Sequence, residues 1–478
     1  MIEQYDIVVI GGGSAGLFAA SAAINQKAKT CLIDKNRLGG DCTWSGCMPS
    51  KALLKSAAVA QLFKKREDYG LATDKEVKII AADVLKHVRS VRETIGSHET
   101  PDVFEARGIK VIIGTPEFKS QDTLEVNGQT ISAKKFIICT GSHPVVPLIE
   151  GLSDIDYLTN QTIFDLKKLP ESMIVLGGGP IGIELAQAFL RLGVRVTVVE
   201  MMDKIMFRED PEVVEMLEKK LRTEGLDVHT GKKAVKFVRK DGQTIVSLEN
   251  KNGTIETICG EKILVAVGRA PNVEGLNLEA CKVEYSIKGI KVNDYLQTTN
   301  SNIFACGDIA SPYQFSHVAA YTAYLCVRNA MFKKLAWSKV NYANVPWATF
   351  TSPELARVGL TEQEAISKFG KDKIRVYRSD YSRSDRAITD LVQDGLVKLI
   401  TDKKGLVIGA HIVGAEAGEI IQGLLIAKSL KIPLSKLATI LFIYPTLSEL
   451  IKKTAAQPLV ESLNNPILKA VIGILKNK

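Results

Sequence analysis

The sequence lacks any stretch of about 20 residues that is free of charges and strong helix breakers, so it predicts no transmembrane helix. Residues 1–5 run directly into an apolar segment without a basic lead or a small-residue cleavage site, which argues against a signal peptide. The eight cysteines form no cluster with the six histidines at zinc-binding spacing. These absences favour a cytoplasmic protein without a metal site of its own.

A strong charge imbalance is also lacking, since 62 Lys and Arg residues stand against 53 Asp and Glu residues. The basic runs are short and scattered, whereas a nucleic-acid footprint would be a concentrated basic stripe. Hydrophobic residues make up 46% and charged residues 24% of the 478 positions, which excludes a disordered chain, a coiled coil or a small disulfide scaffold. We therefore expect roughly three globular domains and no nucleic-acid partner.

What the sequence does contain is a repeated glycine motif. Residues 6–16 read as an apolar strand, a glycine turn and the start of a helix, and residues 173–182 repeat this plan. In each copy an acid, Asp34 or Glu200, follows the third glycine by 18 residues. Such turns let the backbone approach a pyrophosphate, while the acid accepts hydrogen bonds from ribose hydroxyls. The motif therefore predicts two Rossmann-like dinucleotide-binding domains. The fingerprint glycines are Gly11, Gly13 and Gly16 in the first copy and Gly177, Gly179 and Gly182 in the second.

The residues after Glu200 indicate which nucleotide the second site prefers. Glu200 would repel a 2′-phosphate, which would also need arginines nearby. The residues that follow are Met201, Met202, Asp203 and Lys204. This favours NADH, while Lys204 leaves NADPH as the less favoured alternative.

Residues 39–51, with the sequence GGDCTWSGCMPSK, place two cysteines at the junction of a loop and a helix. Pro49 suits the first turn of a helix, and a helix N-terminus lowers the pKa of a thiol. With four residues between them, Cys42 and Cys47 can meet as a reversible disulfide. The alternative for this segment alone is two buried free cysteines.

A different composition begins near residue 342. Strand patterns at 396–400 and 406–413 precede a helix pattern at 415–430, which predicts an antiparallel sheet covered by helices. The tail 466–478 has apolar residues on one helical face and lysines opposite. We expect the tail to pack on this domain, with contact to a membrane surface or a partner as the less favoured alternative.

These motifs occur in a fixed order along the chain, together with Thr140-Gly-Ser142 and Cys306-Gly-Asp308. From residue 5 to about 455 the set resembles the flavin-dependent pyridine nucleotide–disulfide oxidoreductases, which include dihydrolipoamide dehydrogenase, glutathione reductase and mercuric reductase. The cysteine segment looks most similar to the mercuric-reductase-like branch. The resemblance implies an α/β fold with an FAD domain in two parts (1–150 and 271–341), an NAD domain (151–270) and a C-terminal α+β dimerisation domain (342–478).

The resemblance also implies a path for electrons from NADH through FAD to the Cys42–Cys47 disulfide, and then by thiol exchange to an acceptor. Cys47 would face the flavin and Cys42 would exchange with substrate. Lys51 would lie beside the flavin and pair with Glu184, placing positive charge where the reduced flavin is anionic. Besides the fingerprint glycines and acids, the residues expected to bind cofactors are Ser14, Ala15, Lys35, Gly40, Asp41, Cys42, Cys47, Lys51, Gly114, Thr115, Thr140, Gly141, Ser142, Pro180, Ile181, Gly268, Arg269, Gly307, Asp308, Phe315, Ser316 and His317.

One position departs from the family pattern of disulfide-using members. Their His-Pro-Thr signature reads Tyr444-Pro-Thr here, followed by Glu449. An imidazole with a pKa near 6.5 can protonate a leaving thiolate at neutral pH, whereas a phenol near 10 does so far less readily. This disfavours dihydrolipoamide and glutathione disulfide as substrates. Tyrosine here is similar to mercuric reductases, although the C-terminal cysteine pair of those enzymes is missing.

The resemblance further implies a homodimer, in which Tyr444 and Glu449 of one subunit act in the active site of the other. The leading interpretation is reduction of a thiol-reactive acceptor, either a metal ion or a small disulfide. The alternatives are a dihydrolipoyl dehydrogenase and a redox-sensing flavoprotein that binds a partner or a membrane through its basic tail.

Overall fold

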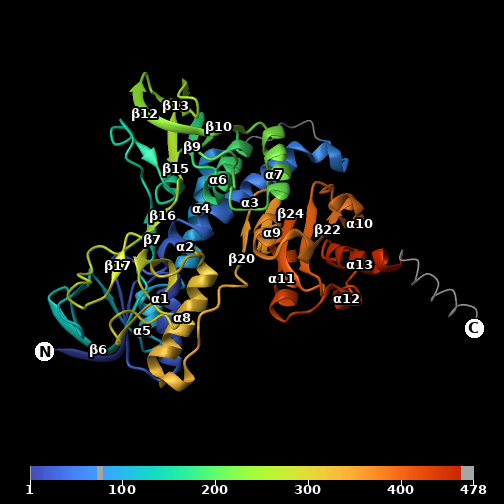
Figure 1. Ribbon diagram of the computed structural model, residues 1–478. Coiled ribbons are helices and arrows are strands. Elements are labelled where there is room, and N and C mark those ends of the chain that lie inside the picture. The colour runs from blue at the N-terminus through green and yellow to red at the C-terminus, as the bar shows by residue number, and fades with distance from the viewer. Residues whose placement is uncertain (1, 73–78, 464–478) are drawn as a thin grey trace, which may run out of the picture. The chain divides into compact units, whose positions relative to one another are not determined.

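The computed structural model describes residues 2–72 and 79–463. The tail 466–478, for which the sequence predicts an amphipathic helix, lies outside the described residues. Contacts along the chain divide it into two compact units, one formed by residues 1–199 and 232–341 and the other by residues 200–231 and 342–478. Figure 1 shows the elements of both units.

The first unit is built on a largely parallel sheet in which the strand order is β3-β2-β1-β6 and β19 also pairs with β6. Alternate residues of β1 enter two different buried clusters, Ile7 and Val9 on one face and Val8 and Ile10 on the other. Burial on both faces explains why the second half of this strand, from Ile7 to Ile10, is an unbroken apolar run. Two long helices, α1 and α8, pack against each other beside the sheet. The strands are β1 (Glu3–Ile10), β2 (Thr30–Asp34), β3 (Lys110–Ile113), β6 (Gln129–Ile138) and β19 (Ile303–Ala305), with β4 (Glu117–Phe118) and β5 (Thr123–Val126) as an antiparallel extension; the helices are α1 (Ser14–Asn25) and α8 (Ser316–Met331).

The same unit contains a second parallel sheet, with the strand order β10-β9-β15-β8. Its central strand β9 is buried along its whole length, and α6 follows it directly. The chain passes from the first sheet to the second through β7 and returns through β16, and these two short strands pair as an antiparallel ribbon. The elements are β7 (Ser142–Pro144), β8 (Tyr157–Leu158), β9 (Ser172–Leu176), α6 (Pro180–Arg191), β10 (Arg195–Glu200), β15 (Lys262–Val265) and β16 (Arg269–Pro271), with β12 (Lys232–Lys240), β13 (Gln243–Asn250) and β14 (Ile255–Gly260) as a separate antiparallel sheet.

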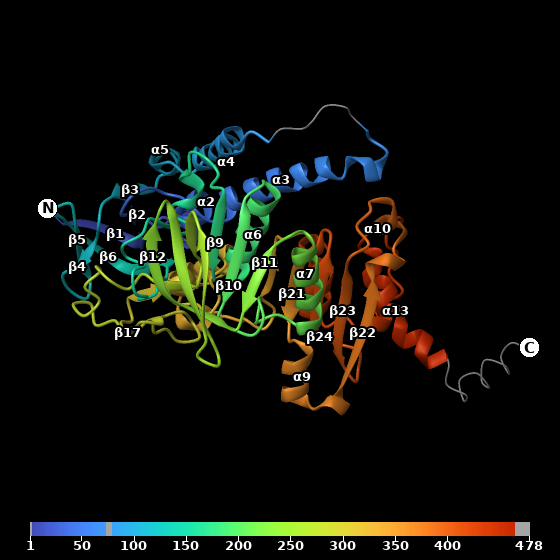
Figure 2. The same cartoon turned by 90° about the horizontal axis from the view of Figure 1, so that it is seen from above.

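Two further groups of elements complete the first unit. The helices α3 and α4 pack side by side (Figure 2), and the short helix α2 precedes α3. The hairpin β17–β18 lies in the segment before β19. The bounds are α2 (Gly40–Trp44), α3 (Cys47–Lys64), α4 (Ala81–Gly96), α5 (Pro101–Glu105), β17 (Tyr285–Ser286) and β18 (Gly289–Ile290).

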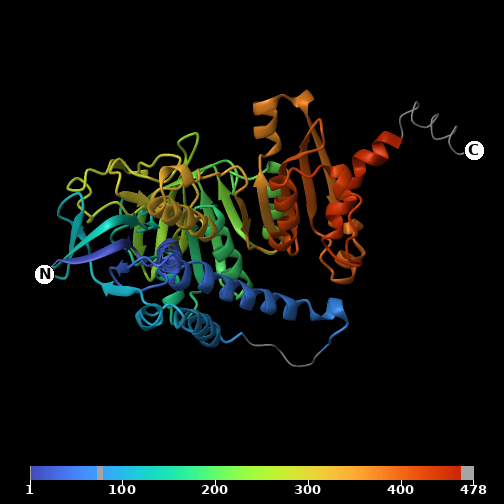
Figure 3. The same cartoon turned by 90° about the horizontal axis from the view of Figure 1, so that it is seen from below.

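The second unit is an antiparallel sheet, with the order β20-β21-β24-β23-β22, and helices packed on it (Figure 3). The helices α11 and α13 share one buried apolar cluster with the strands. Helix α9 begins at a capping box formed by Thr361 and Glu364, which satisfies backbone N–H groups at its start. The elements are α7 (Pro211–Thr223), β11 (Asp227–Thr230), β20 (Pro346–Thr349), β21 (Glu354–Gly359), α9 (Glu362–Phe369), β22 (Ile374–Asp380), α10 (Asp385–Thr389), β23 (Leu396–Asp402), β24 (Val407–Gly414), α11 (Ala417–Ser429), α12 (Leu434–Leu437) and α13 (Glu449–Leu463).

A buried ion cluster ties the segment 200–231 to this antiparallel sheet. The ammonium of Lys398, on β23, lies 2.8 Å from carboxylate oxygens of Asp210, Glu212 and Glu362, and its side chain is only 3% exposed. Arg378 adds a second cation to Glu212 and Glu362. The start of α7 is therefore held to β22 and β23 by two cations shared among three carboxylates.

These two units confirm the predicted fold class, with two Rossmann-like parallel sheets and a C-terminal α+β region. The domain boundaries at residues 150, 270 and 341 stay predictions. No helix within residues 2–72 or 79–463 combines the length and the apolar character needed to span a bilayer.

Candidate active site

The two cysteines of the GGDCTWSGC segment lie side by side. Cys42 sits on the single turn of α2, and Cys47 is the first residue of α3. Both are free thiols, both are half-buried, and a hydrogen bond joins them. The hydroxyl of Ser316, at the start of α8, is 3.5 Å from the Cys47 sulfur. The structure therefore brings together three of the predicted site residues, Cys42, Cys47 and Ser316.

The surroundings shift the pKa values of the two cysteines in opposite directions, which favours a thiolate on Cys47 and a thiol on Cys42. The hydrogen bond from Cys42 lowers the pKa of Cys47 from 9.0 to about 6, with help from Ser316 and the positive charge of Lys51 and against the effects of burial and Glu184. The same hydrogen bond, together with burial, raises the pKa of Cys42 well above its ordinary value. At neutral pH the reduced pair therefore carries one negative charge, on Cys47.

Lys51 and Glu184 form an ion pair next to the cysteines. Lys51 stands one turn after Cys47 on α3, and its ammonium donates to Glu184 on α6 at 2.8 Å. The Glu184 side chain is 8% exposed and that of Lys51 is 37% exposed. A positive charge is thus held beside Cys47 by a buried carboxylate on α6, the helix that follows the central strand of the second parallel sheet.

The first glycine fingerprint forms a turn in which two of its three glycines, Gly11 and Gly16, leave no room for a side chain. Gly11 has a φ of 104°, and a Cβ there would clash with the carbonyl of Cys139. A Cβ on Gly16 would in turn clash with the carbonyl of Gly11. The carboxylate of Asp34 accepts a hydrogen bond from the N–H of Gly12 at 2.7 Å, which closes the turn. The backbone at the start of α1 is therefore bare, as binding of the FAD pyrophosphate requires.

The second fingerprint repeats this geometry at the end of β9. Gly177 has a φ of 107° and closely approaches the carbonyl of Ala266, and Gly182 closely approaches Gly177. Open space lies where a side chain of Gly179 would stand. Glu200 is buried and accepts the N–H of Met202 at 2.7 Å, which fixes its carboxylate at the end of β10. The residues therefore fit a second dinucleotide.

Asp308 lies beside the β7–β16 ribbon. Its carboxylate accepts a hydrogen bond of 2.5 Å from the hydroxyl of Ser142. Burial raises the pKa of Asp308, while the Ser142 hydrogen bond and the charge of Arg269 act in the opposite direction. Such a partly buried, oriented carboxyl group is suited to the hydroxyl groups of a ribityl chain, which is the role that the family resemblance implies for it.

The remaining predicted cofactor residues fall into two groups. Phe315, which precedes α8, and His317, the second residue of α8, stack with their ring centroids 5.4 Å apart on either side of Ser316 in the sequence. Thr140 is fixed by Asn272, whose amide donates to the Thr140 carbonyl at 2.7 Å. The others lie just after strands or at the first residues of helices, namely Gly13, Ser14, Ala15, Lys35, Gly40, Gly114, Thr115, Gly141, Pro180, Ile181, Gly268 and Gly307.

Tyr444 has a partner that the sequence did not reveal. Its hydroxyl donates a hydrogen bond of 2.7 Å to Asp385, at the start of α10. This bond raises the pKa of the exposed phenol further above its ordinary value. Glu449, the other predicted residue of this region, begins α13 and lies 3.7 Å from Lys453. Because 59 positions separate Asp385 from Tyr444, no local pattern could have found it.

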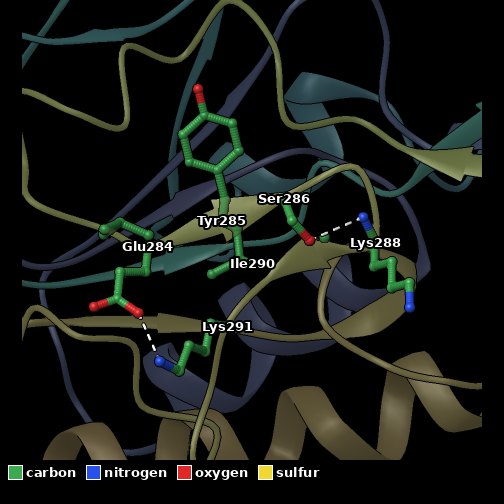
Figure 4. A pocket seen from close by; sticks show the side chains of 8 residues that line it. Glu284, Tyr285, Ser286, Lys288, Ile290 and Lys291 are labelled. Carbon is green, nitrogen blue, oxygen red and sulfur yellow. Dashed lines mark hydrogen bonds and ion pairs between the residues drawn. The ribbon is translucent and has the colours of Figure 1, made fainter.

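A surface pocket of about 530 Å³ surrounds the hairpin β17–β18 (Figure 4). Its charges are partly satisfied, since Lys291 pairs with Glu284 at 2.7 Å. It is lined by residues 283–286 and 288–291, and none of the predicted catalytic or cofactor-binding residues is among them. We assign it no role in the chemistry.

Residues 5–323 match the family described as pyridine nucleotide-disulphide oxidoreductase, and residues 345–455 match the dimerisation domain of that family. A mercuric reductase of Bacillus cereus is 36% identical over 94% of this chain and 70% of its own length. A dihydrolipoyl dehydrogenase of Rhizobium etli is 34% identical over 97% of this chain and its own full length.

A solved structure agrees with the sequence relatives. The Cu(II) complex of a HOCl-induced flavoprotein disulfide reductase, RclA, from Escherichia coli matches with a TM-score of 0.84 and 26% identity, over 95% of this chain and all of that chain. The predicted family, enzyme class and use of FAD with a pyridine nucleotide are confirmed, and the dimerisation domain supports a homodimer. The chain therefore belongs to the pyridine nucleotide-disulphide oxidoreductase family, as an FAD- and NAD(P)H-dependent oxidoreductase that acts on a sulfur group or a metal ion.

Proposed function

We propose that this enzyme passes electrons from NADH, through FAD, to the Cys42–Cys47 disulfide and then to a thiol-reactive acceptor. The observation that carries the proposal is the pairing of the two cysteines, with opposite pKa shifts, next to the ion pair of Lys51 and Glu184. Reduction of the disulfide takes up two electrons and one proton, which leaves a thiol on Cys42 and a thiolate on Cys47. FAD, when bound, supplies the two-electron transfer between the nucleotide and the disulfide.

The chain's own residues divide the work between them. The thiol of Cys42 hydrogen-bonds the Cys47 thiolate and is the group that exchanges with the acceptor. Lys51 stabilises negative charge beside Cys47, and Glu184 holds its ammonium in place. The preference for NADH rests on Glu200, because a buried carboxylate at that point repels a 2′-phosphate.

We place Tyr444 and Glu449 at the partner subunit's cysteine pair, as the family's dimerisation domain suggests. With its hydroxyl bonded to Asp385, Tyr444 is a poor proton donor for a leaving thiolate. The neighbouring carboxylate instead adds negative charge, which suits a cationic acceptor. A metal ion, as in the relatives named mercuric reductase, is therefore favoured over a small disulfide.

The alternative is a dihydrolipoyl dehydrogenase, because relatives with that name cover the chain equally well. The redox-sensing alternative depends on the tail 466–478, which lies outside the described residues. A cytoplasmic location stays a prediction.

An acceptor screen tests the proposal. NADH oxidation is measured with Hg(II), lipoamide, glutathione disulfide and quinones, using the holoenzyme and Cys42→Ser as the matched control. We expect turnover with Hg(II) that Cys42→Ser abolishes, and low turnover with lipoamide. Lipoamide turnover that far exceeds that of every metal ion would favour the dehydrogenase. Acceptor reduction that Cys42→Ser leaves intact would show that the cysteine pair is not on the path.

A further inference from the structure

We propose that Asp41 and Arg269 form a clamp that positions Cys42, by fixing α2 against the β7–β16 ribbon. The inference rests on the proposed role of the Cys42–Cys47 pair and adds positioning residues to it. The sequence had placed both Asp41 and Arg269 among the cofactor-binding residues, whereas in the structure their charged groups bind each other.

Helix α2 needs such support because it is a single turn of five residues. A helix this short does not hold its shape on its own backbone hydrogen bonds. One side of it is anchored within the first nucleotide-binding region. Thr43 donates to Glu99 at 2.7 Å, the indole of Trp44 donates to the Leu38 carbonyl at 2.6 Å, and Arg92 donates to the Trp44 carbonyl at 3.2 Å. These contacts hold the end of the turn that follows Cys42.

Asp41, which directly precedes Cys42, anchors the other side. One oxygen of its carboxylate accepts the hydroxyl of Ser45 at 2.8 Å, and the other forms an ion pair with the guanidinium of Arg269. The amide of Asn160 donates to the Ser45 carbonyl at 3.1 Å and reaches Asp41 at 3.4 Å. The carboxylate therefore links the turn that carries Cys42 to β16 and to the segment after β8.

Arg269 makes this link rigid because all its contacts use fixed positions of one planar group. Its Nε donates to the hydroxyl of Ser142 at 2.8 Å, and an Nη that pairs with Asp41 also donates to the Ser142 carbonyl at 2.9 Å. Ser142 in turn donates to Asp308. The guanidinium, with its side chain 14% exposed, thus sits between the carboxylate beside Cys42 and the carboxyl proposed to bind the flavin. A lysine could pair with Asp41 but could not reproduce the fork.

The position of this clamp gives it a consequence for the reaction. The β7–β16 ribbon is where the chain crosses between the two nucleotide-binding sheets, so the place of Cys42 is set by the same ribbon that borders Asp308. Exchange between two sulfurs depends steeply on their alignment, and a displacement of about 1 Å can cost a factor of about 100 in rate. Loss of the clamp should therefore slow electron transfer into the disulfide.

The test uses the holoenzymes of wild type, Asp41→Asn, Arg269→Lys, Arg269→Gln and the double variant Asp41→Asn/Arg269→Gln. Anaerobic stopped-flow with NADH follows the long-wavelength absorbance that a Cys47 thiolate gives beside oxidised flavin. FAD content and thermal unfolding of the oxidised enzymes are measured in parallel. The matched control is Lys134→Gln, which breaks the exposed ion pair of Lys134 and Asp6.

We expect Asp41→Asn and Arg269→Gln each to lower the rate at which this absorbance forms by about tenfold, and the double variant to lose little more than the worse single variant. Arg269→Lys should fall between wild type and Arg269→Gln, and Lys134→Gln should match wild type. If Arg269→Gln fails to fold, the test uses Asp41→Asn, which keeps the size of the side chain, and Arg269→Lys, which keeps its charge.

The outcomes separate the two proposals. A wild-type enzyme without the absorbance would overturn the proposed role of the cysteine pair itself. If the wild type shows the absorbance and the clamp variants form it at rates within about twofold of the wild-type rate, the clamp alone is overturned. If the rate losses of the two single variants multiply in the double variant, Asp41 and Arg269 act independently, which also contradicts the clamp.

Discussion

Replacing Cys42 with alanine should raise the pKa of Cys47, because the hydrogen bond from Cys42 is the largest of the effects that lower it. The pKa of Cys47 falls from 9.0 to about 6. At about 1.4 kcal/mol for each pKa unit, the site favours the thiolate by about 4 kcal/mol relative to water. The hydrogen bonds from Cys42 and Ser316 and the charge of Lys51 stabilise the thiolate by more than burial destabilises it. Without its main donor, Cys47 should titrate at least about one pH unit higher.

The assay is a pH titration of the thiolate-to-flavin absorbance. In the reduced wild type this absorbance should persist above the pKa and fade as the pH falls through about 6, because protonation removes the thiolate. Cys42→Ala should show it without reduction, since no disulfide can form, but with a midpoint at higher pH. Cys42→Ser keeps a hydroxyl donor in place and should titrate close to wild type. A wild-type midpoint near 9, or equal midpoints in the alanine and serine variants, would refute the reasoning.

Four further outcomes are expected. Tyr444→His should raise the turnover of lipoamide or glutathione disulfide several-fold in steady-state assays while lowering that of metal ions, because an imidazole with a pKa near 6.5 exchanges protons at neutral pH. Unchanged lipoamide turnover would mean that another base carries the proton. Glu200→Ala combined with Met201→Arg should shift the ratio of kcat/KM values toward NADPH by removing repulsion and adding a phosphate partner, and a ratio that does not move would place the discrimination elsewhere. Lys398→Met should lower the free energy of unfolding by about 3–5 kcal/mol in denaturant titrations, because three carboxylates lose a buried cation, whereas the exposed-pair variant Lys134→Gln should stay within about 1 kcal/mol of wild type. His411 is fully buried, and burial lowers its pKa to about 4. Its contribution to the free energy of unfolding is therefore complete above about pH 6.5 and is lost as the pH falls through 4. His411→Gln should make the free energy of unfolding fall less steeply between these pH values, and an unchanged slope would exclude His411 as the titrating group.

The parts of this molecule that the sequence predicted are those whose chemistry is local. The turns at Gly11 and Gly177 could be recognised because a strand, a tight turn and a helix follow one another within a few residues, and the clashes at a Cβ show why glycine is needed there. The cysteine segment was recognisable for the same reason. The pairing of Lys51 with Glu184 spans 133 positions and came only from the family resemblance.

Other contacts could not be predicted from the sequence. Asp385 stands among ordinary surface residues, and only the fold brings it to the Tyr444 hydroxyl. Asn160 and Arg269 reach Asp41 across 119 and 228 positions. Each of these is a polar side chain whose type fits many surface roles, and its partner depends on how separate segments pack. The roles of the site residues in catalysis stay predictions that the variants above test.

The cluster around Lys398 has a consequence for any attempt to dissect this protein into modules. By sequence, α7 follows the second glycine fingerprint and belongs with the nucleotide-binding part, while Lys398 belongs with the dimerisation domain. A cut near residue 341 would leave Asp210 and Glu212 on one fragment and Lys398, Arg378 and Glu362 on the other. Each fragment would then expose to water a face that was built for opposite charge. The two fragments should reassociate when mixed, with an affinity that falls as salt is added.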